Sequence, residues 1–439
     1  MPKARLYFDY AASTPVAPEV EAVMRPYFLT RFGNAGSLHS FGQEAVAALD
    51  ESREIIAKAV GAGFREIIFT GSATEANNLA LRGVIKRFKN YDLGFRNGDI
   101  LNRKSKIINP RIIVSAIEHE SVLETARDLE KEGIEIVYLP VSKNGIVDLK
   151  KLKNSINERT VLVSVMYANN EVGTIQPVSE IAKIITDFRK QMADSEERRV
   201  KSKSIRHEPL AISYWPLFHT DAVQAFQFLG CNVEELGVDL MTLSAHKIYG
   251  PKGIGMLYVK NIEPRKQKIE INNKKILNSK FYFLDSIIAG GGQEFGLRSG
   301  TENIPLIAGF AKAVSLVSNS RELENKRISK LRDYFWKELK KIYPAATRNG
   351  HPKNILPNFL NVGFPGLAAA DLLVGFDLAG LAVSAGSACS ARSAKPSHVM
   401  EAIGLSGKQS RQNIRFTLGR PTSKKDIDNA LKIIRKLLL

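Results

Sequence analysis

Short runs of β-branched and other apolar residues alternate with helical patterns along most of the chain. The runs are IIF at 67–69, RIIVSA at 111–116, IEIVYL at 134–139, VLVSVM at 161–166, DLMTLS at 239–244 and GMLYVK at 255–260. Between them lie predicted helices such as 43–60, which Gly61 is expected to close as a C-cap. Strands that alternate with helices predict an α/β fold with a large, mostly parallel sheet.

The pattern changes after residue 318. A long charged helix is predicted over 321–341, followed by an Asn-, Gly- and Pro-rich stretch with strand character. We therefore expect a large domain over 14–318 and a smaller α+β domain over 319–439, to which the N-terminal arm 1–13 also belongs. Stretches predicted as inserted loops are 90–110, 190–213 and 261–287.

The composition is typical of a globular protein and excludes several other kinds of protein and site. The 439 residues are 44% hydrophobic and 25% charged, with two cysteines, Cys231 and Cys389. A chain of this length builds a large core without disulfides or structural metal, and two cysteines exclude a disulfide scaffold and a four-cysteine zinc site. The most apolar long stretch, 367–386, contains Asp371 and Asp377, so it predicts no membrane span. The N-terminus has no secretory or organellar signal pattern, and we expect a cytoplasmic protein.

The net charge of +18 is unevenly placed. The stretch 86–111 holds eight basic and two acidic residues, and 260–280 holds seven and two. Neither has interleaved aromatic residues or a recognisable nucleic-acid module. We interpret both as solvated loops and expect no direct contact with nucleic acid, although the charge is suited to steering an acidic protein or RNA towards the molecule.

The strongest chemical signal is a lysine that follows a buried strand. Lys247 lies in SAHKIYGPKG at 244–253, and Asp221 ends an aromatic strand that comes one strand earlier. A pyridoxal phosphate site needs a lysine for the covalent link and a carboxylate that keeps the pyridine nitrogen protonated. Taken without Asp221, Lys247 would be interpreted as a charged surface residue. Together, Lys247 and Asp221 fit the two roles.

A phosphate site is predicted at the start of a helix. IIFTGSATEANNLALRG, from residue 67, supplies a strand, a glycine turn and a helix start in that order. Ser72 and Glu75 have the spacing of a capping box, so a well-capped helix is the simpler interpretation of the motif alone. Ligands bind at the carboxyl ends of parallel strands, where Lys247 and Asp221 are also expected, and this favours the phosphate.

Two further strand ends carry polar side chains, at 118–121 and 168–171. A histidine such as His119 is able to stack on a flat aromatic cofactor and exchange protons, and an asparagine such as Asn170 is able to hydrogen-bond its phenolate. The alternative for His119 is helix capping beside Ser121.

Cys389 lies in SAGSACSARSAKPSH at 384–398, where small residues predict a flexible loop. Arg392 and Lys395 would favour the thiolate, the nucleophilic form, if they come close to it. Cys231 lacks such neighbours, and we interpret it as a packing residue.

These motifs jointly resemble the cysteine desulfurases of the NifS/IscS type, class V members of the fold-type I pyridoxal-phosphate enzymes. The shared motifs run from YFDYAASTP at 7–15 to IRFTLGR at 414–420 and include EHESVL, ANNEVGTIQP, HTDAVQ, GGGQEFGLRSGTEN and SAGSACS. The resemblance covers nearly the whole chain. It implies a fold-type I transferase in which a small C-terminal domain carries the Cys389 loop.

The resemblance also implies a role for individual residues. Lys247 would carry pyridoxal 5'-phosphate, Asp221 would face its pyridine nitrogen and His119 would stack on its ring. The other implied contacts are Gln224 and Asn170 on the phenolate side, Ala73, Thr74, Ser244 and His246 around the phosphate, Thr301 at the phosphate of a neighbouring subunit, and Asn34, Asn170 and Arg415 at the substrate.

The implied activity is conversion of L-cysteine to L-alanine by a homodimer. Sulfur would be held as a persulfide on Cys389 and passed to an acceptor protein, either an iron–sulfur scaffold or a tRNA thiolation enzyme. A selenocysteine lyase or another class V lyase or aminotransferase is the nearest alternative, and a basic nucleic-acid-binding scaffold is an alternative of another class. Cys389 favours the desulfurase because an aminotransferase needs no second nucleophile.

The sequence departs from the family pattern at several positions. Gly71 and Ser72 reverse the usual Ser-Gly order, and Phe295 stands where the family usually has arginine. Ala35-Gly36 replaces Pro-Ser. Arg392 and Lys395 replace the usual Gly and Glu, so docking of the acceptor is expected to differ.

Overall fold

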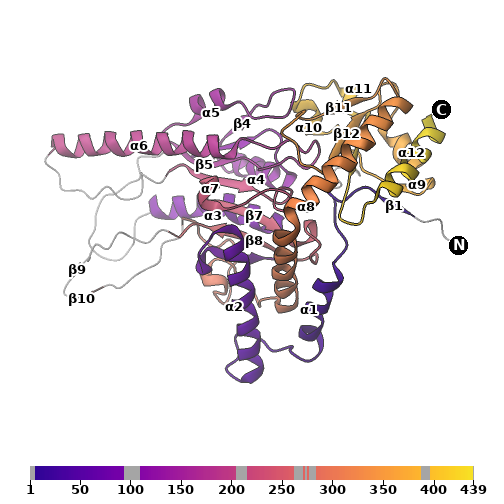
Figure 1. The fold of residues 1–439 in the computed structure, drawn as a ribbon. Coiled ribbons are helices and arrows are strands. Elements are labelled where there is room, and N and C mark those ends of the chain that lie inside the picture. Colours follow the sequence, from indigo (N-terminus) through magenta and orange to yellow (C-terminus); the bar gives the residue numbers. More distant parts are fainter. Residues whose placement is uncertain are drawn as a thin grey trace.

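A seven-stranded sheet forms the core of the larger lobe (Figure 1). The computed structural model describes residues 5–92, 109–203, 215–261, 270–271, 274–275, 283–386 and 396–438. The strands, in sheet order, are β2 (Ile67–Thr70), β8 (Gly255–Val259), β7 (Leu240–Ser244), β6 (Leu217–Asp221), β5 (Thr160–Ser164), β3 (Arg111–Ser115) and β4 (Glu135–Leu139). Strand β8 runs antiparallel to β2 and β7, and the other neighbouring pairs are parallel. The predicted mostly parallel sheet is therefore confirmed.

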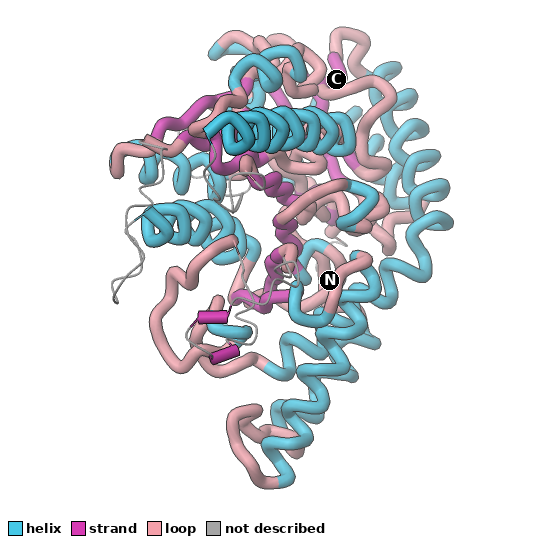
Figure 2. The backbone as a smooth tube through the Cα atoms, turned by 90° about the vertical axis from the view of Figure 1, so that its left-hand side faces the viewer, coloured by secondary structure: helices cyan, strands magenta, loops and turns pink. Residues whose placement is uncertain are grey.

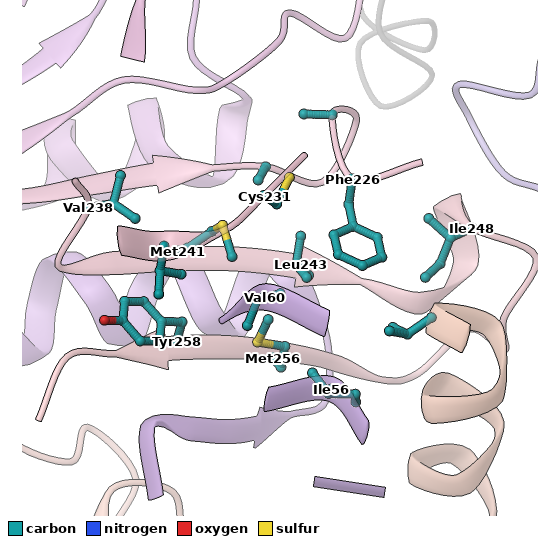
Figure 3. Packing of buried hydrophobic residues seen from close by; sticks show 14 of the residues in the cluster. Ile56, Val60, Phe226, Cys231, Val238, Met241, Leu243, Ile248, Met256 and Tyr258 are labelled. Carbon is teal, nitrogen blue, oxygen red and sulfur yellow. The ribbon is translucent and has the colours of Figure 1, made fainter. Parts of the chain in front are cut away.

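Helices cover both faces of this sheet (Figure 2). The strands β2, β5, β6, β7 and β8 are buried at every position. This burial explains why β2, β5, β7 and β8 are mostly apolar in sequence. One face packs against α3 (Ala73–Asp92) and α4 (Glu120–Lys131). The other packs against α2 (Ser40–Val60) and α6 (Val178–Lys203), and Figure 3 shows Ile56 and Val60 of α2 among Met241, Leu243 and Met256 of the sheet.

The ends of α2 follow from its sequence. Gly61 closes the helix with φ of +70°, a left-handed conformation that glycine adopts without a steric penalty, as predicted. Helix α1 (Pro18–Leu29) precedes α2 and, like α2, packs against α8 (Ile304–Ile342). The shorter helices of this lobe are α5 (Leu149–Ser155) and α7 (Val233–Leu236).

The smaller lobe contains a three-stranded antiparallel sheet in the order β11 (Thr347–Asn349), β12 (Phe359–Gly363), β14 (Asn413–Thr417). Its helices are α9 (Ala369–Leu378), α10 (His398–Ala402), α11 (Gly407–Ser410) and α12 (Lys424–Leu438). The N-terminal strand β1 (Leu6–Tyr7) pairs in parallel with β13 (Leu381–Ala382), so the arm at the start of the chain lies on the lobe formed by its end.

Helix α8 is continuous over 39 residues and serves both lobes. Ile307 and Phe310 in its first half belong to the core of the large sheet, whereas Phe335 and Leu339 in its second half belong to the core of the smaller lobe. The division that we predict at residue 318 therefore falls inside one helix. The change in sequence pattern reflects a change of packing partners rather than a linker.

The stretch 190–213 was expected to be a loop, and that expectation is wrong for its first part. Helix α6 continues to Lys203 and projects beyond the sheet (Figure 1). Its Gln-, Met-, Ala-, Glu- and Arg-containing sequence explains the continuation, because these residues favour helices. Within 261–287, β9 (Glu270–Ile271) pairs with β10 (Lys274–Lys275) in antiparallel fashion.

Residues 93–108 and 204–214 of the other expected loops lie outside the described residues. In the described part of the chain, no helix has the length and apolar character that a bilayer crossing requires.

Candidate active site

A cavity of about 400 Å³ lies at the carboxyl ends of the parallel strands. It is lined by segments that follow β2, β3, β5, β6 and β7, together with the N-terminal arm and β14. The predicted residues that line it are Ala73, Thr74, His119, Asn170, Asp221, Gln224, Ser244, His246, Lys247 and Arg415. The fold thus brings together side chains that are up to 342 positions apart in the sequence.

Lys247 ends a short 3-10 turn directly after β7. Its Nζ donates hydrogen bonds to the backbone oxygens of Ala11 at 2.7 Å and Ala12 at 2.8 Å. The Nε2 of Gln224 donates to the same Ala11 oxygen at 3.0 Å. The N-terminal arm therefore forms one wall of the cavity and holds the side-chain amine of Lys247 in place.

Asp221 is fixed by a chain of hydrogen bonds that begins on α3. Its Oδ2 accepts from Asn77 Nδ2 at 2.9 Å, and its Oδ1 accepts from the backbone N–H of Val223 at 3.0 Å. Asn77 Nδ2 also donates to Ser121 Oγ at 2.8 Å, and Ser121 Oγ lies 2.9 Å from His119 Nδ1. The carboxylate and the imidazole are thus oriented by one shared set of buried side chains.

His119 is the N-cap of α4, since its Nδ1 accepts a hydrogen bond of 3.1 Å from the backbone N–H of Ser121. The capping interpretation is therefore correct, and the same side chain lines the cavity. Burial lowers the pKa of His119, as does the charge of Lys247, whereas Asp221 raises it. Because Nδ1 accepts a hydrogen bond, the proton of the neutral ring lies on Nε2.

The charges around the cavity suit an anionic ligand. Burial lowers the pKa of His246 to about 4, with help from the charges of Lys247 and Lys252, so this imidazole is neutral at neutral pH. Among the described lining residues, Lys247, Lys252 and Arg415 carry positive charge, and Asp221 is the one carboxylate. Such a surface matches a ligand that carries a phosphate and a carboxylate.

The N-terminus of α3, with its positive dipole end, also faces this cavity. Ser72 Oγ accepts from the backbone N–H of Glu75 at 3.1 Å, as the capping box predicts, but the Glu75 carboxylate accepts from Gly71 rather than from Ser72. Gly255 lets β8 approach this turn, because a Cβ there would lie 2.8 Å from the Ala73 nitrogen. The turn is thus held close to the sheet from both sides.

Arg415 is a buried cation at the edge of the cavity. Its Nη1 donates to the backbone oxygen of Asn170 and its Nη2 to Asp9 Oδ1, both at 2.7 Å. Within the described residues, Arg415 Nε and Asn170 Oδ1 are buried without a hydrogen-bond partner. Both atoms belong to residues that line the cavity, where a bound ligand or water would be able to supply the missing partners.

The comparison with known proteins agrees with this arrangement. The family model described as aminotransferase class-V matches residues 6–192 and 211–430. The chain belongs to the class-V aminotransferase family. It is 40% identical over 436 residues to the cysteine desulfurase IscS of Dictyoglomus turgidum. The aligned region covers 99% of this chain and 95% of that relative.

Solved structures of class-V aminotransferase relatives lead to the same fold. A NifS-like protein matches with a TM-score of 0.78 and 31% identity over 99% of both chains. SspA in complex with cysteine matches with a TM-score of 0.68 and 33% identity over 94% of this chain and 98% of that one. The resemblance to NifS/IscS-type proteins and the fold-type I architecture are thereby confirmed.

Three predicted residues of this class-V chain lie away from the cavity or outside the described part. Asn34 lies in an exposed turn between α1 and α2, where its Oδ1 accepts from the backbone N–H of Gly36 at 2.8 Å. Thr301 is exposed just before α8. Cys389 lies outside the described residues. Cys231 is buried, and burial raises the pKa of its thiol to about 12, so its interpretation as a packing residue is confirmed.

Asn77, Ser121 and Asp9 contribute to the site but were absent from the predicted set. The signal for Asn77 is a polar residue on a helix face that otherwise carries Ala80, Leu81 and Val84, since a buried amide needs a partner. Asp9 pairs with Arg415 across 406 positions of sequence, a contact that no local pattern indicates.

Phe295 occupies a position at which the family usually has arginine, and its ring lies against two guanidinium groups. Its ring centroid lies 4.9 Å from the guanidinium carbon of Arg53 and 5.7 Å from that of Arg65. Arg53 also donates two hydrogen bonds of 2.7 Å to the carboxylate of Glu294. The loop before α8 is therefore fastened to α2 by a buried ion pair that an aromatic ring covers.

Proposed function

We propose that this chain is a pyridoxal-phosphate-dependent cysteine desulfurase that converts L-cysteine to L-alanine and holds the sulfur as a persulfide on Cys389. The observation that carries this proposal is the cavity at the strand ends, which brings Lys247, Asp221 and His119 to the start of α3. The identity of 40% to a relative named cysteine desulfurase supports the choice of substrate. The similarity to SspA, solved with cysteine, supports it independently.

The residues present fit pyridoxal phosphate. Its ring, when bound, supplies an electron sink for negative charge at the carbons of an amino acid. Lys247 would hold the group covalently, Asp221 would keep the ring nitrogen protonated and His119 would lie against the ring. Phosphate contacts would come from Ala73, Thr74, Ser244 and His246, and phenolate contacts from Asn170 and Gln224.

The chain's own groups are suited to moving protons. A neutral His119 with its proton on Nε2 is able to give that proton and take another, whereas an imidazolium would lack a lone pair. The side-chain amine of Lys247, which lines the same cavity, would serve as a second base. Arg415, together with Asn170, would bind the substrate carboxylate, since guanidinium groups bind carboxylates through paired hydrogen bonds. Asn34 is left out of this proposed contact because it is not among the residues that line the cavity.

The sulfur-transfer step balances without an outside oxidant. The thiolate of Cys389 attacks the sulfur of L-cysteine, so that an S–S bond forms and the Cβ–S bond breaks. The electron pair of the broken bond stays with the substrate carbon, which takes a proton and becomes the methyl group of alanine. An acceptor thiolate that attacks the outer sulfur takes it as a new persulfide, and Cys389 returns as a thiolate. A thiol reductant that attacks the inner sulfur instead forms a mixed disulfide with Cys389 and releases sulfide.

The finer parts of the proposal concern assembly. A homodimer would let Thr301 of one subunit approach the phosphate of the other, and the exposure of Thr301 supports this. The sulfur acceptor would be an iron–sulfur scaffold or a tRNA thiolation enzyme. We place the reaction in the cytoplasm, where thiols stay reduced.

The experiment is an absorbance spectrum of the purified protein, followed by assays for alanine and sulfide after L-cysteine and a thiol reductant are added. A yellow protein that forms both products supports the proposal. C389A is expected to keep the colour and lose both products, and C231A, which changes a buried packing cysteine, is the matched control expected to retain them. Sulfide production by C389A would overturn the assignment, and keto-acid formation would favour an aminotransferase.

A further inference from the structure

Glu171 is a buried carboxyl group that follows the cavity residue Asn170. Its Oε2 accepts a hydrogen bond of 2.6 Å from Ser397 Oγ. The same oxygen lies against Gly386, where a Cβ would fall 3.1 Å from it, and Gly386 has φ of +79°. Residues 387–395, which include Cys389, connect Gly386 to the residue before Ser397. Both described flanks of the Cys389 stretch therefore meet one oxygen atom of Glu171.

A second contact fastens the same flank to another wall of the cavity. His398 Nε2 donates a hydrogen bond of 3.0 Å to the backbone oxygen of Glu118, which directly precedes His119. Ser397 and His398 stand at the start of α10, whose Val399 and Met400 pack in a small apolar cluster. The first turn of α10 is thus tied to the segments that follow β3 and β5, from which His119 and Asn170 enter the cavity.

Helix capping alone does not account for the Glu171 contact. Ser397 Oγ already caps α10 by accepting from the backbone N–H of Met400 at 3.2 Å, and it donates its own proton to Glu171. Ser406 caps α11 in the same way, accepting from the backbone N–H of Gln409 at 3.4 Å. Burial raises the pKa of Glu171, while the Ser397 hydrogen bond and the charges of His398 and Arg415 lower it. Placing a carboxyl in this position is costly, and its hydrogen bond to Ser397 offsets part of the cost.

We propose that Glu171 is a positioning residue that, through Ser397, fixes both flanks of the Cys389 stretch against the cavity wall and thereby sets the sulfur-transfer step. This inference rests on the proposed function. It assigns Glu171 and Ser397 no contact with substrate or cofactor. Their effect is on the step that needs Cys389 and not on the steps that need the cavity alone.

Two reactions of the holoenzyme separate these steps. Formation of alanine from L-cysteine in a single turnover needs Cys389, whereas exchange of the Cα hydrogen of L-alanine in D₂O needs only the cavity. S397A is expected to slow alanine formation about tenfold and to leave Cα exchange within about twofold of the unaltered protein. S397T keeps the hydroxyl and is expected to restore the rate. S406A, which removes an equivalent cap without a Glu171 contact, is expected to change neither reaction.

The partner of Ser397 is tested by a double variant. E171Q removes the charge but keeps an acceptor, so its loss is expected to be smaller than that of S397A, and E171Q/S397A is expected to be no slower than S397A. Fully additive losses would overturn the proposal, because the two residues would then act separately. S397A that behaves like S406A, or that slows both reactions equally, would overturn it too.

The same two reactions distinguish an error in the proposed desulfurase activity from an error in the role of Glu171. An unaltered holoenzyme that exchanges the Cα hydrogen of L-alanine but forms no alanine from L-cysteine would remove the desulfurase assignment, and the role of Glu171 with it. A fully active holoenzyme with an unaffected S397A variant would remove the role of Glu171 alone.

Discussion

The side-chain amide of Asn77 donates a hydrogen bond of 2.9 Å to Asp221 and another of 2.8 Å to Ser121. Asn77 is fully buried and is not among the described residues that line the cavity, whereas Asp221 and Ser121 are. One side chain of α3 therefore orients both the carboxylate proposed for the pyridine nitrogen and the serine that contacts His119 Nδ1.

We expect N77A to lower kcat/KM for L-cysteine about tenfold and to weaken retention of pyridoxal phosphate, because Asp221 loses a buried hydrogen bond. The measurements are steady-state alanine formation and cofactor loss on dialysis. N78A is the matched control, because the neighbouring Asn78 does not line the cavity and its side chain donates to the backbone oxygen of Thr74 in its own helix. Equal behaviour of the two variants would contradict the role assigned to Asn77.

R415K is expected to raise KM for L-cysteine about tenfold or more, because lysine cannot reproduce the planar fork that Asn170 and Asp9 hold in place. R420K is the control, since Arg420 stacks 4.8 Å from the Tyr249 ring, outside the residues that line the cavity. Denaturant unfolding of both variants checks that the fold is intact. An unchanged KM in R415K would remove Arg415 from substrate binding.

E294Q is expected to lower the free energy of unfolding by about 3–5 kcal/mol, the usual effect of breaking a buried ion pair. The side chains of Arg53 and Glu294 are only 3% and 1% exposed, so the guanidinium would keep its charge without a counterion. Urea or guanidinium titration measures the change.

The matched variant for E294Q is E324Q, which breaks the more exposed Arg327–Glu324 pair and is expected to cost less than about 1 kcal/mol. A small effect in E294Q would mean that stacking by Phe295 and Phe69, and not the ion pair, holds Arg53.

Acid is expected to destabilise the fold through His219. This ring lies within the sheet, with Nδ1 2.8 Å from Ser164 Oγ and Nε2 3.1 Å from Thr242 Oγ1, and burial lowers its pKa to about 3. The unfolded ring takes a proton near pH 6.5, whereas the folded ring stays neutral. The contribution to stability is therefore complete above pH 6.5 and is lost as the pH falls towards 3, by at most about 1.4 kcal/mol per pH unit.

Unfolding measured at several pH values tests this effect, with H219Q as the comparison. Between pH 6.5 and 4.5 the stability of H219Q is expected to fall less steeply than that of the unaltered chain. The test compares how the free energy of unfolding of each protein changes with pH. This comparison is needed because burial raises the pKa of Glu118 to about 8, so Glu118 gives both proteins a pH dependence of the opposite sign. Parallel curves would show that His219 does not titrate as proposed.

The sequence was sufficient to predict the sheet and much of the cavity lining because their signals are local. Most of the buried strands of the large sheet are short apolar runs, and many of the polar lining groups stand at or shortly after the carboxyl end of a strand. Lys247, Asp221 and His119 were predictable for this reason. The pattern was less reliable where packing partners change inside one element, as in α8, or where helix formers continue past the core, as in α6.

The contacts that complete the site were not predictable from local sequence. Asp9 meets Arg415, and Glu171 meets Ser397, across hundreds of positions, and only the fold brings them together. Asn77 is closer to prediction, because a lone amide on an apolar helix face requires a partner, although the sequence does not name that partner.

The N-terminal arm links the site to the order in which the chain is made. Ala11, whose backbone oxygen accepts from Lys247, donates its own N–H to Thr417 Oγ1 at 2.9 Å. Ala11 is synthesised 406 residues before Thr417, so the arm lacks its partner in β14 while the chain between them is being made. Lys247 and α3 emerge well before that wall of the cavity is in place. A nascent chain that has not yet reached β14 therefore lacks a complete pocket, and we expect the vitamin-derived cofactor to be captured only after β14 has been made.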